Sequence, residues 1–385
     1  MKQLEIYIHI PFCVKKCYYC DFLSAKSDEG TMHNYVRALI KEIELSAHKM
    51  QGYSIRSVFV GGGTPSILEG EWIEQIIGAL RDKGNIADDA EITIECNPGT
   101  LTREKIDSYL KAGINRISIG LQSANDNELK MLGRIHTWDD FLASYNMVRE
   151  AGIDNVNVDL MSALPIQTKN SYEQTLEKVC ALNPEHISAY SLIVEDETPL
   201  KAWLESEDDK GNNLLPSEDE ERVMYYLTKK VLEKHGYKRY EISNYAKPGK
   251  ECIHNLGYWE RVEYLGFGIG AASLYQSVRY NNIEELYKYI AFLDEYADVD
   301  RLHVNLVSLS TNDQIEEFMF LGLRKVKGVD TEKFKEMFSR DINLVYGNQL
   351  DKLERQGFLT REGNNIRLTE KGIDVSNIVL ANFML

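Results

Sequence analysis

Short segments rich in β-branched residues alternate with longer segments of helical periodicity through the first half of the chain. Six such short segments predict β-strands, at Leu4–Ile10, Ser57–Val60, Glu91–Glu95, Arg116–Gly120, Asn155–Leu160 and His186–Ser191. Strands that alternate with helices pair in parallel, because each helix returns the chain to the edge at which the previous strand began. The sequence therefore predicts an α/β fold, with barrel closure or an open doubly wound sheet as the two options.

The chain divides into two predicted domains, residues 1–300 and 301–385. The first includes an acidic stretch, 195–222, which we expect to be a solvated excursion because it holds eleven acidic and three basic side chains. The second predicts helices followed by a β-hairpin around Glu362-Gly363-Asn364, an order typical of a winged helix. Its 12 Lys and Arg balance 12 Asp and Glu, whereas a DNA-reading wing is normally basic. We expect a lid or packing domain and no nucleic-acid partner.

Composition argues against permanent contact with nucleic acid or membrane. The 385 residues carry 44 Lys and Arg against 60 Asp and Glu, and the net charge of −16 repels phosphate backbones and anionic lipids. No apolar run is long enough to span a bilayer, and Glu5 and His9 interrupt any signal-peptide core. We therefore expect a cytoplasmic protein whose six cysteines are reduced, as metal ligands or buried side chains.

Three of these cysteines, Cys13, Cys17 and Cys20, follow the first predicted strand with the spacing C-x3-C-x2-C. Three thiolates on one loop can hold three irons of a [4Fe–4S] cube, since each iron takes one protein thiolate, and the fourth iron stays open to a small molecule. This spacing favours an iron–sulfur cluster.

The cysteines have two other possible interpretations, a structural zinc site and reduced core thiols. Structural zinc takes four ligands, usually as two separated pairs, but Cys96, Cys180 and Cys252 stand alone in the sequence. Three reduced, buried thiols are the second alternative, and the charged neighbours Lys15 and Asp21 make the segment too polar for that.

Polar groups also follow the other predicted strands. They are Gly61–Thr64 after the second, Glu95 at the third, Gln122 after the fourth and Asp159 at the fifth. Each alone could be a capped turn or a paired core residue. Because ligands collect at the carboxyl ends of parallel strands, the five positions together, cysteines included, favour a single site.

The cysteine spacing after a first strand resembles the radical S-adenosylmethionine (SAM) superfamily. The resemblance implies a partial (β/α)6 barrel in which the amino and carboxylate groups of SAM bind the open iron. Longer sequence strings resemble one family within this superfamily, the oxygen-independent coproporphyrinogen III oxidases. The strings are Tyr7–Cys13, Gly61–Pro65, Glu95–Gly99, Gly120–Ser123 and Arg367–Gly372. Carrying the family's SAM contacts to matching positions gives Tyr7, Tyr19, Gly62, Gly63, Thr64, Glu95, Gln122, Arg134 and Asp159.

Two features distinguish subfamilies. The oxidases resemble C-x3-C-x2-C-x-C, and Phe22 stands here at the fourth cysteine position. The string His254-Asn255-Leu256-Gly257-Tyr258-Trp259 resembles the HN-x-x-YW signature of the HemW-type haem chaperones. That resemblance implies haem binding, with His254 as the axial ligand and Cys252 as a weaker candidate.

The resulting hypothesis is a haem chaperone with a SAM-liganded [4Fe–4S] cluster that passes haem to respiratory or other haem-requiring proteins. Membrane-bound recipients would imply transient peripheral membrane contact, although no basic amphipathic helix supports it. The alternative is an enzyme, a coproporphyrinogen III dehydrogenase or another porphyrin-directed radical SAM protein. A zinc- or DNA-binding regulator is disfavoured by ligand count and charge. Cleavage of SAM, the recipient and a homodimeric state are left open by the sequence.

Overall fold

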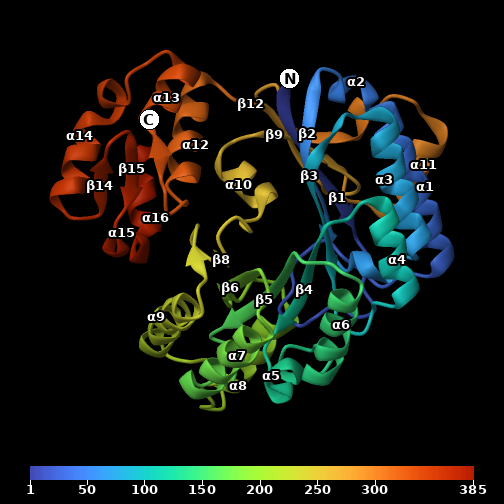
Figure 1. Ribbon diagram of the computed structural model, residues 1–385, viewed down its shortest axis with the longest axis horizontal. Helices are drawn as coiled ribbons and strands as arrows, with labels where there is room; N and C mark the ends of the chain where they lie inside the picture. Colours follow the sequence, from blue (N-terminus) through green and yellow to red (C-terminus); the bar gives the residue numbers. More distant parts are fainter.

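The computed structural model describes residues 1–385 and contains two separate hydrophobic cores (Figure 1). The larger core lies in a twelve-stranded mixed sheet and its helices, and the smaller one lies between residues 315 and 383. None of the helices combines the length and the apolar composition needed to span a bilayer.

All six predicted parallel strands are present and lie side by side in chain order. They are β1 (Lys2–Ile10), β2 (Tyr53–Gly62), β3 (Ile86–Cys96), β4 (Arg116–Gln122), β5 (Val156–Ser162) and β6 (His186–Ser191). The α/β prediction is therefore confirmed, and the sheet is open rather than a closed barrel.

The parallel strands are longest at β1–β3, and the crossover helices return the chain between them. These helices are α1 (Glu29–Leu45), α2 (Ala47–Met50), α3 (Gly70–Lys83), α4 (Arg103–Ala112), α5 (Asp126–Met131), α6 (Trp138–Glu150) and α7 (Lys169–Leu182). Side-chain caps begin several of them. Thr137, for example, starts α6 with a reciprocal capping box to Asp140.

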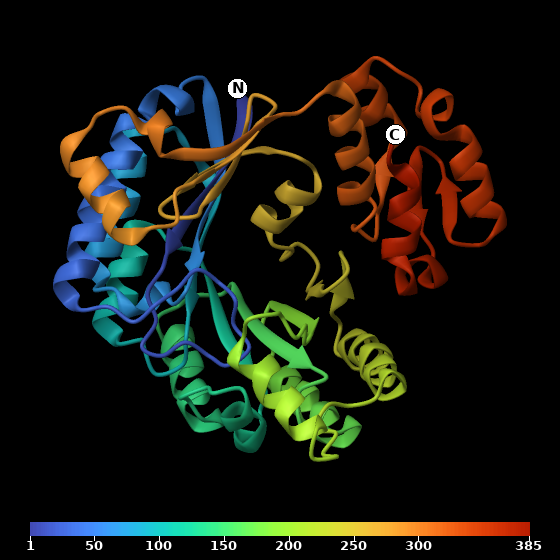
Figure 2. The ribbon, with the colours of Figure 1, turned by 180° about the vertical axis from the view of Figure 1, so that it is seen from behind.

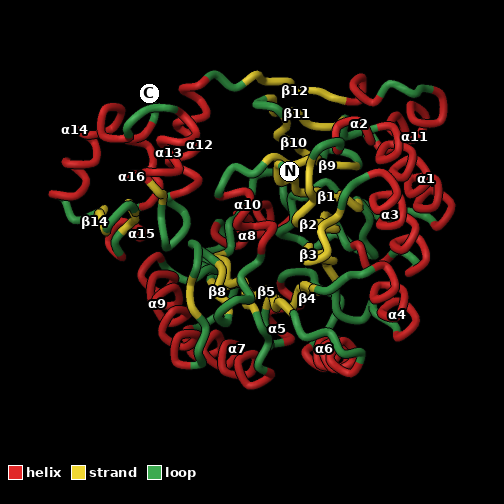
Figure 3. The backbone as a smooth tube through the Cα atoms, turned by 45° about the horizontal axis from the view of Figure 1, so that its top comes forward, coloured by secondary structure: helices red, strands yellow, loops and turns green.

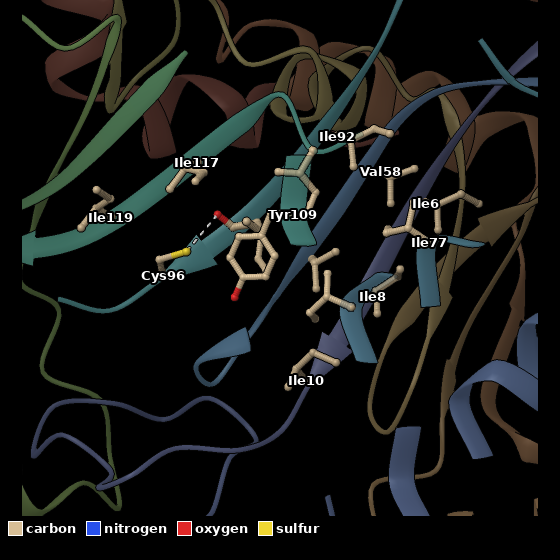
Figure 4. Packing of buried hydrophobic residues seen from close by; sticks show 14 of the residues in the cluster. Ile6, Ile8, Ile10, Val58, Ile77, Ile92, Cys96, Tyr109, Ile117 and Ile119 are labelled. Carbon is tan, nitrogen blue, oxygen red and sulfur yellow. Dashed lines mark hydrogen bonds between the residues drawn. The ribbon is translucent and has the colours of Figure 1, made fainter. Parts of the chain in front are cut away.

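Alternation along the strands sorts the side chains between the two faces of the sheet. Figure 4 shows the branched residues Ile6, Ile8 and Ile10 of β1 on the face that packs against helices, where α3 contributes Ile77 and α4 contributes Tyr109. Successive side chains of a strand point to opposite faces. The residues between the branched ones, which carry most of the predicted site, therefore line the concave face of the sheet.

Further strands extend both edges of the sheet, which the strand–helix alternation did not predict. Of these, β9 pairs with β1 in parallel, whereas the others join through antiparallel pairings. Next to β1 come β9 (Glu263–Phe267), β10 (Ala272–Tyr275), β11 (Val278–Asn282) and β12 (His303–Ser308); next to β6 come β8 (Asn244–Ala246) and β7 (Lys238–Arg239). Figure 3 follows this order from β12 to β8 along the curved sheet. The glycine-rich stretch 265–271 thus forms the end of β9 and the turn into β10.

The acidic stretch is not wholly a solvated excursion, because it contains α8 (Pro199–Asp208) and the start of α9 (Glu218–Lys234). Thr198 caps α8, and its buried Leu200 and Leu204 join a small apolar cluster with Leu132. Two leucines at i and i+4 are enough to anchor a short helix whose other faces are acidic. Ser217 and Glu220 form a reciprocal capping box at the start of α9.

The C-terminal unit has the predicted winged-helix-like order. Its elements are α12 (Thr311–Gly322), β13 (Val329–Asp330), α13 (Thr331–Phe338), α14 (Ile342–Arg355), β14 (Leu359–Glu362), β15 (Asn365–Leu368), α15 (Glu370–Asp374) and α16 (Ser376–Leu380). The hairpin β14–β15 turns at Gly363, and β13 adds a third strand. Strand β12, at the start of the predicted second domain, pairs with β11 of the large sheet.

Two further helices complete the larger part, α10 (Ile253–Trp259) and α11 (Leu286–Glu295). Figures 1 and 2 show α10 between the large sheet and the C-terminal unit. It packs on the concave face, where the imidazole of His254 stacks on Phe59 of β2 with ring centroids 5.2 Å apart. A Cβ on Gly257 would overlap the carboxylate of Glu5 on β1. Only a glycine therefore allows α10 to sit this close to the sheet.

Gly257→Ala is accordingly expected to destabilise the fold by about 1–3 kcal/mol, since the methyl group must displace Glu5 or the helix. The matched control is Gly78→Ala in α3, where a Cβ meets no atom within 4 Å. That change should leave stability unchanged or raise it by up to about 1 kcal/mol. Urea unfolding followed by circular dichroism measures both. Equal midpoints for the two variants would contradict the close packing of α10.

Candidate functional site

The loop after β1 and the carboxyl ends of β2–β5 enclose one cavity of about 700 Å³, part of it open to solvent. Most of the predicted site residues line it: Cys13, Cys17, Tyr19, Cys20, Gly62, Gly63, Thr64, Glu95, Gln122, Arg134 and Asp159. Tyr7 and His254 are the two that do not. Residues from five strands therefore meet at one place, as the strand-end argument predicts.

The three cysteines are reduced and unequally covered. Cys13 is buried, whereas Cys17 and Cys20 are half-buried. The hydroxyl of Thr64 lies 3.5 Å from Cys13 Sγ, and Arg134 Nη1 lies 3.5 Å from Cys17 Sγ. These two donors are therefore within reach of the sulfurs that would bind a cluster, and hydrogen bonds to the sulfurs tune a cluster's potential.

The donor set fits a multi-iron cluster better than a single metal ion. Nowhere in the structure do three or more His, Cys, Asp or Glu side chains converge on a point where one ion would fit. A [4Fe–4S] cube spreads its ligands, because each thiolate binds a different iron. The three thiols line one cavity, so each could bind a different iron, whereas structural zinc takes four ligands.

The turn after β2 brings backbone close to the cysteine loop. Gly62 has φ of 116°, which a side chain would strain, and a Cβ on Gly63 would lie 2.7 Å from the Phe12 carbonyl and 3.0 Å from Cys13 Sγ. The N–H of Gly62 donates to Glu95 Oε2 at 3.1 Å. Bare backbone beside the cysteines leaves room for a ligand to approach both.

Two partly buried carboxyl groups, Glu95 and Asp159, face the same cavity. Burial raises the pKa of Glu95 to about 8, and the charge of Asp159 adds to the shift. Burial likewise raises the pKa of Asp159, although Ser118 donates to its Oδ2 at 3.0 Å and Asn157 to its Oδ1 at 2.8 Å. A cationic group in the cavity would relieve both carboxyls, because an opposite charge favours their ionised forms.

Arg134 brings the opposite charge to the same cavity. Its Nη2 donates to Asn97 Oδ1 at 2.9 Å and to the Gly120 carbonyl at 2.7 Å, while its buried Nε has no partner. An unpaired buried donor is costly, so a ligand carboxylate would fit there. The cavity thus offers carboxylates to a cation and a guanidinium to an anion, which suits an amino acid-like ligand such as SAM.

Two lining residues, Asn97 and Ser118, were not assigned to the site from the sequence. Asn97 Nδ2 donates to Thr64 Oγ1 at 2.8 Å, so this side chain joins Thr64 to Arg134. Ser118 holds Asp159. The signal for Ser118 was strand alternation, since it lies two residues before Gly120 on the concave face. Asn97 could have been found only as part of the string Glu95–Gly99.

A second cavity of about 1300 Å³ adjoins the first and shares Phe22, Gly62 and Glu95 with it. Its lining is mainly apolar and aromatic: Tyr7, His9, Leu23, Tyr258, Trp259, Tyr264, Gly270, Ala271, Ala272, Leu274 and Leu321, with Arg261 and Arg279. Tyr7, a predicted site residue, therefore lines the second cavity and not the one that holds the cysteines. Its hydroxyl is 3.0 Å from His9 Nδ1.

His254 is not placed as an open axial ligand. Its side chain is 2% exposed and lines neither cavity. Nδ1 is 2.9 Å from the Ser57 hydroxyl and Nε2 is 3.0 Å from the Tyr258 hydroxyl, so both ring nitrogens have partners. Burial lowers the pKa of His254 to about 3, with Arg56 and Arg116 adding to the shift. The neutral ring instead holds Tyr258, which does line the second cavity.

Cys252 is also turned away from both cavities. It is fully buried, and its thiol donates to Glu91 Oε1 at 3.3 Å. Burial raises the pKa of this thiol to about 12, so the thiolate that a metal needs is disfavoured. Sequence spacing could not show that the residues before α10 face the sheet.

The raised pKa of Glu95 predicts a pH-dependent stability. The folded state holds this proton up to about pH 8, whereas the unfolded chain loses it near pH 4.5. Stability should therefore fall as the pH rises through this window, by at most about 1.4 kcal/mol per pH unit from this group. Glu95→Gln should flatten the slope of the urea midpoint between pH 6 and 8, and Glu150→Gln at an exposed position should not. Identical slopes in all three proteins would refute the buried, protonated carboxyl.

Comparisons with known proteins agree with this geometry. The pattern of the radical SAM superfamily matches residues 7–179, and that of the HemN C-terminal domain matches residues 309–375. Coproporphyrinogen III oxidase (HemN) from Escherichia coli, a radical SAM enzyme, has the same fold: the TM-score is 0.85 at 24% identity, over 100% of this chain and 90% of that one. Fold and site together define a radical SAM protein.

Relatives that match along the full length of the chain show which family of radical SAM proteins it belongs to. The chain is 36% identical to heme chaperone HemW of Lactococcus lactis, over 100% of this chain and 98% of the relative, and 35% identical to heme chaperone HemW of Bacillus subtilis, over 98% of both. It is 31% identical to the mitochondrial radical S-adenosyl methionine domain-containing protein 1 of Danio rerio, over 100% of this chain and 87% of the relative. The chain belongs to the coproporphyrinogen oxidase-like family of radical SAM proteins, together with the HemW proteins.

Proposed function

We propose that this protein is a haem chaperone, which binds haem and passes it to haem-requiring proteins. The observation that carries the proposal is the aromatic cavity that shares a wall with the cysteine cavity. Its 1300 Å³ includes open solvent, and the part that a water-sized molecule can enter measures about 580 Å³. Ligand cavities of a few hundred to about a thousand Å³ with apolar walls suit rigid, flat, hydrophobic ligands such as a tetrapyrrole. The full-length relatives named heme chaperones support the same function.

The cysteine cavity is proposed to hold a [4Fe–4S] cluster through Cys13, Cys17 and Cys20, with SAM on the fourth iron. With both bound, the site would supply one-electron chemistry at the sulfonium of SAM. Arg134 would orient the carboxylate of SAM, and Glu95 and Asp159 would face its positive charge. The other proposed SAM contacts are Tyr7, Tyr19, Gly62, Gly63, Thr64 and Gln122.

Respiratory proteins are the proposed recipients, and the cytoplasm is the proposed location. Membrane-bound recipients would require only transient contact with a membrane surface. The second candidate, oxidation of coproporphyrinogen III, is favoured by the likeness of fold to HemN. Phe22 in place of a fourth cysteine stands against it.

The function is tested by haem transfer. We expect anaerobically reconstituted protein to bind haemin, with a Soret band that saturates at one equivalent. The bound haem should then move to added apomyoglobin faster than the protein loses it to buffer alone. The same preparation, reduced and supplied with SAM, should leave coproporphyrinogen III unchanged. Absence of a saturable Soret band would reject the chaperone, and stoichiometric decarboxylation of coproporphyrinogen III would establish the enzyme instead.

His254 is proposed to act in haem binding through Tyr258. We expect His254→Ala and Tyr258→Phe to weaken haemin binding by similar factors, about three- to tenfold, because both remove the hydrogen bond that joins His254 to Tyr258. The Soret maximum and spin state of bound haem should stay unchanged in both. A spectral shift confined to His254→Ala would show instead that the imidazole reaches the iron, as the resemblance to HemW proteins implies.

A further inference from the structure

The aromatic cavity has a cationic edge. Arg261, in the turn after α10, and Arg279, on β11, both line it, and Leu321 of α12 lines the same space from the C-terminal unit. Apolar walls with two guanidinium groups on one side match the chemistry of a flat apolar ring that carries carboxylates along one edge.

One carboxylate already occupies this edge. Glu317, also on α12, accepts from Arg261 Nε at 2.8 Å and from Arg279 Nη1 at 2.7 Å. The Glu317 carboxylate and Arg261 are each only 6% exposed, whereas Arg279 is 38% exposed. A single carboxylate therefore bridges two guanidinium groups, and the cluster keeps one positive charge in excess.

The binding capacity of the arginines is not exhausted by Glu317. A guanidinium has five N–H donors in a planar fork. Arg261 makes hydrogen bonds only through Nε, so the donors of its terminal nitrogens remain available. The backbone of Arg261 has φ of 55°, a conformation that non-glycine residues adopt only when their surroundings impose it. This turn places the guanidinium at the cavity.

We propose that Arg261 and Arg279 bind the propionate carboxylates of a tetrapyrrole held in the aromatic cavity, and that Glu317 occupies their place when the cavity is empty. The identity of the ligand rests on the proposed function. Glu317 belongs to the C-terminal unit, so the exchange of carboxylates would loosen the contact between α12 and the large sheet as the ligand binds. The C-terminal unit then acts as a lid whose closed state is held by a carboxylate of its own.

The alternative is that the three side chains only fasten α12 to the sheet. The two explanations differ in their response to the ligand's carboxylates, and haemin dimethyl ester has the same ring and iron without them. If the arginines bind propionates, the wild-type protein should bind haemin at least tenfold more tightly than the ester. Arg279→Gln should reduce haemin affinity toward that of the ester and leave ester affinity unchanged.

Glu317→Gln provides the second, isosteric test. Removing the competing carboxylate should raise haemin affinity about three- to tenfold with little change for the ester, whereas a merely structural Glu317 would give unchanged or weaker binding of both. Arg367→Gln, on the wing hairpin where Arg367 pairs with Glu362, is the control and should have no effect. Equal affinity of the wild type for haemin and its ester would overturn the inference while leaving the chaperone proposal standing. Failure to bind either compound would reject the proposed function itself.

Discussion

Cys17→Ala should abolish the iron–sulfur centre. After anaerobic reconstitution we expect about four irons and four sulfides per wild-type chain, with a broad absorption near 400 nm, and less than about a tenth of each in the variant. A cube held by only two protein thiolates has two open irons and disassembles readily. Cys17 is a better choice than the buried Cys13 because its side chain is half-buried, so the fold should survive its loss.

The control for this experiment is Cys180→Ala. Cys180 is a buried, reduced cysteine on α7 that does not line the cysteine cavity. Its removal should leave iron content and absorption unchanged. If Cys17→Ala retains a full complement of iron and sulfide, Cys17 is not a ligand and the proposed cluster assignment fails. Zinc in place of iron in the anaerobically isolated wild-type protein would also contradict the cluster assignment.

Arg134→Met is the second change with a large expected effect. The guanidinium is buried beside Cys17 and faces the cavity with an unpaired Nε, while Asn97 and the Gly120 carbonyl hold its other end. Loss of a charge-assisted hydrogen bond to a ligand carboxylate costs about 1.5–3 kcal/mol, which corresponds to a roughly 10- to 150-fold weaker SAM affinity.

Equilibrium dialysis of labelled SAM against reconstituted protein measures this change, with iron content determined on the same samples. The control is Arg81→Met, because Arg81 also bonds a backbone carbonyl, that of Ala112, but lies outside the cavity. Wild-type SAM affinity in an Arg134→Met protein with a full cluster would remove Arg134 from the site. A loss of iron in parallel with SAM would show that Arg134 supports the cluster.

Much of this architecture follows from the order of residues along the chain. Branched residues at every second position, such as Ile6, Ile8 and Ile10, require one covered face and so place the residues between them on the other. Once six such strands run in parallel, Glu95, Gln122 and Asp159 must gather at one end of the sheet. The convergence of the site was therefore predictable without knowing any distance.

Other features depend on contacts that sequence spacing does not encode. The strands β9–β12 and β7–β8 are short. They join the core through β9 beside β1 and β8 beside β6, and these pairings connect segments far apart in the chain that no local pattern marks. Whether His254 faces a cavity or the sheet depends on how α10 is rotated. That rotation is set by Gly257 fitting against Glu5 and by the hydrogen bond to Ser57, and neither contact can be read from the string HN-x-x-YW.

The wall shared by the two cavities has a practical result. Phe22, Gly62 and Glu95 each face both spaces, so a molecule in one chamber touches the side chains that a molecule in the other must also meet. The absorption spectrum of a pigment bound in the larger chamber should therefore shift when the smaller chamber is filled. That shift would report when both chambers are occupied.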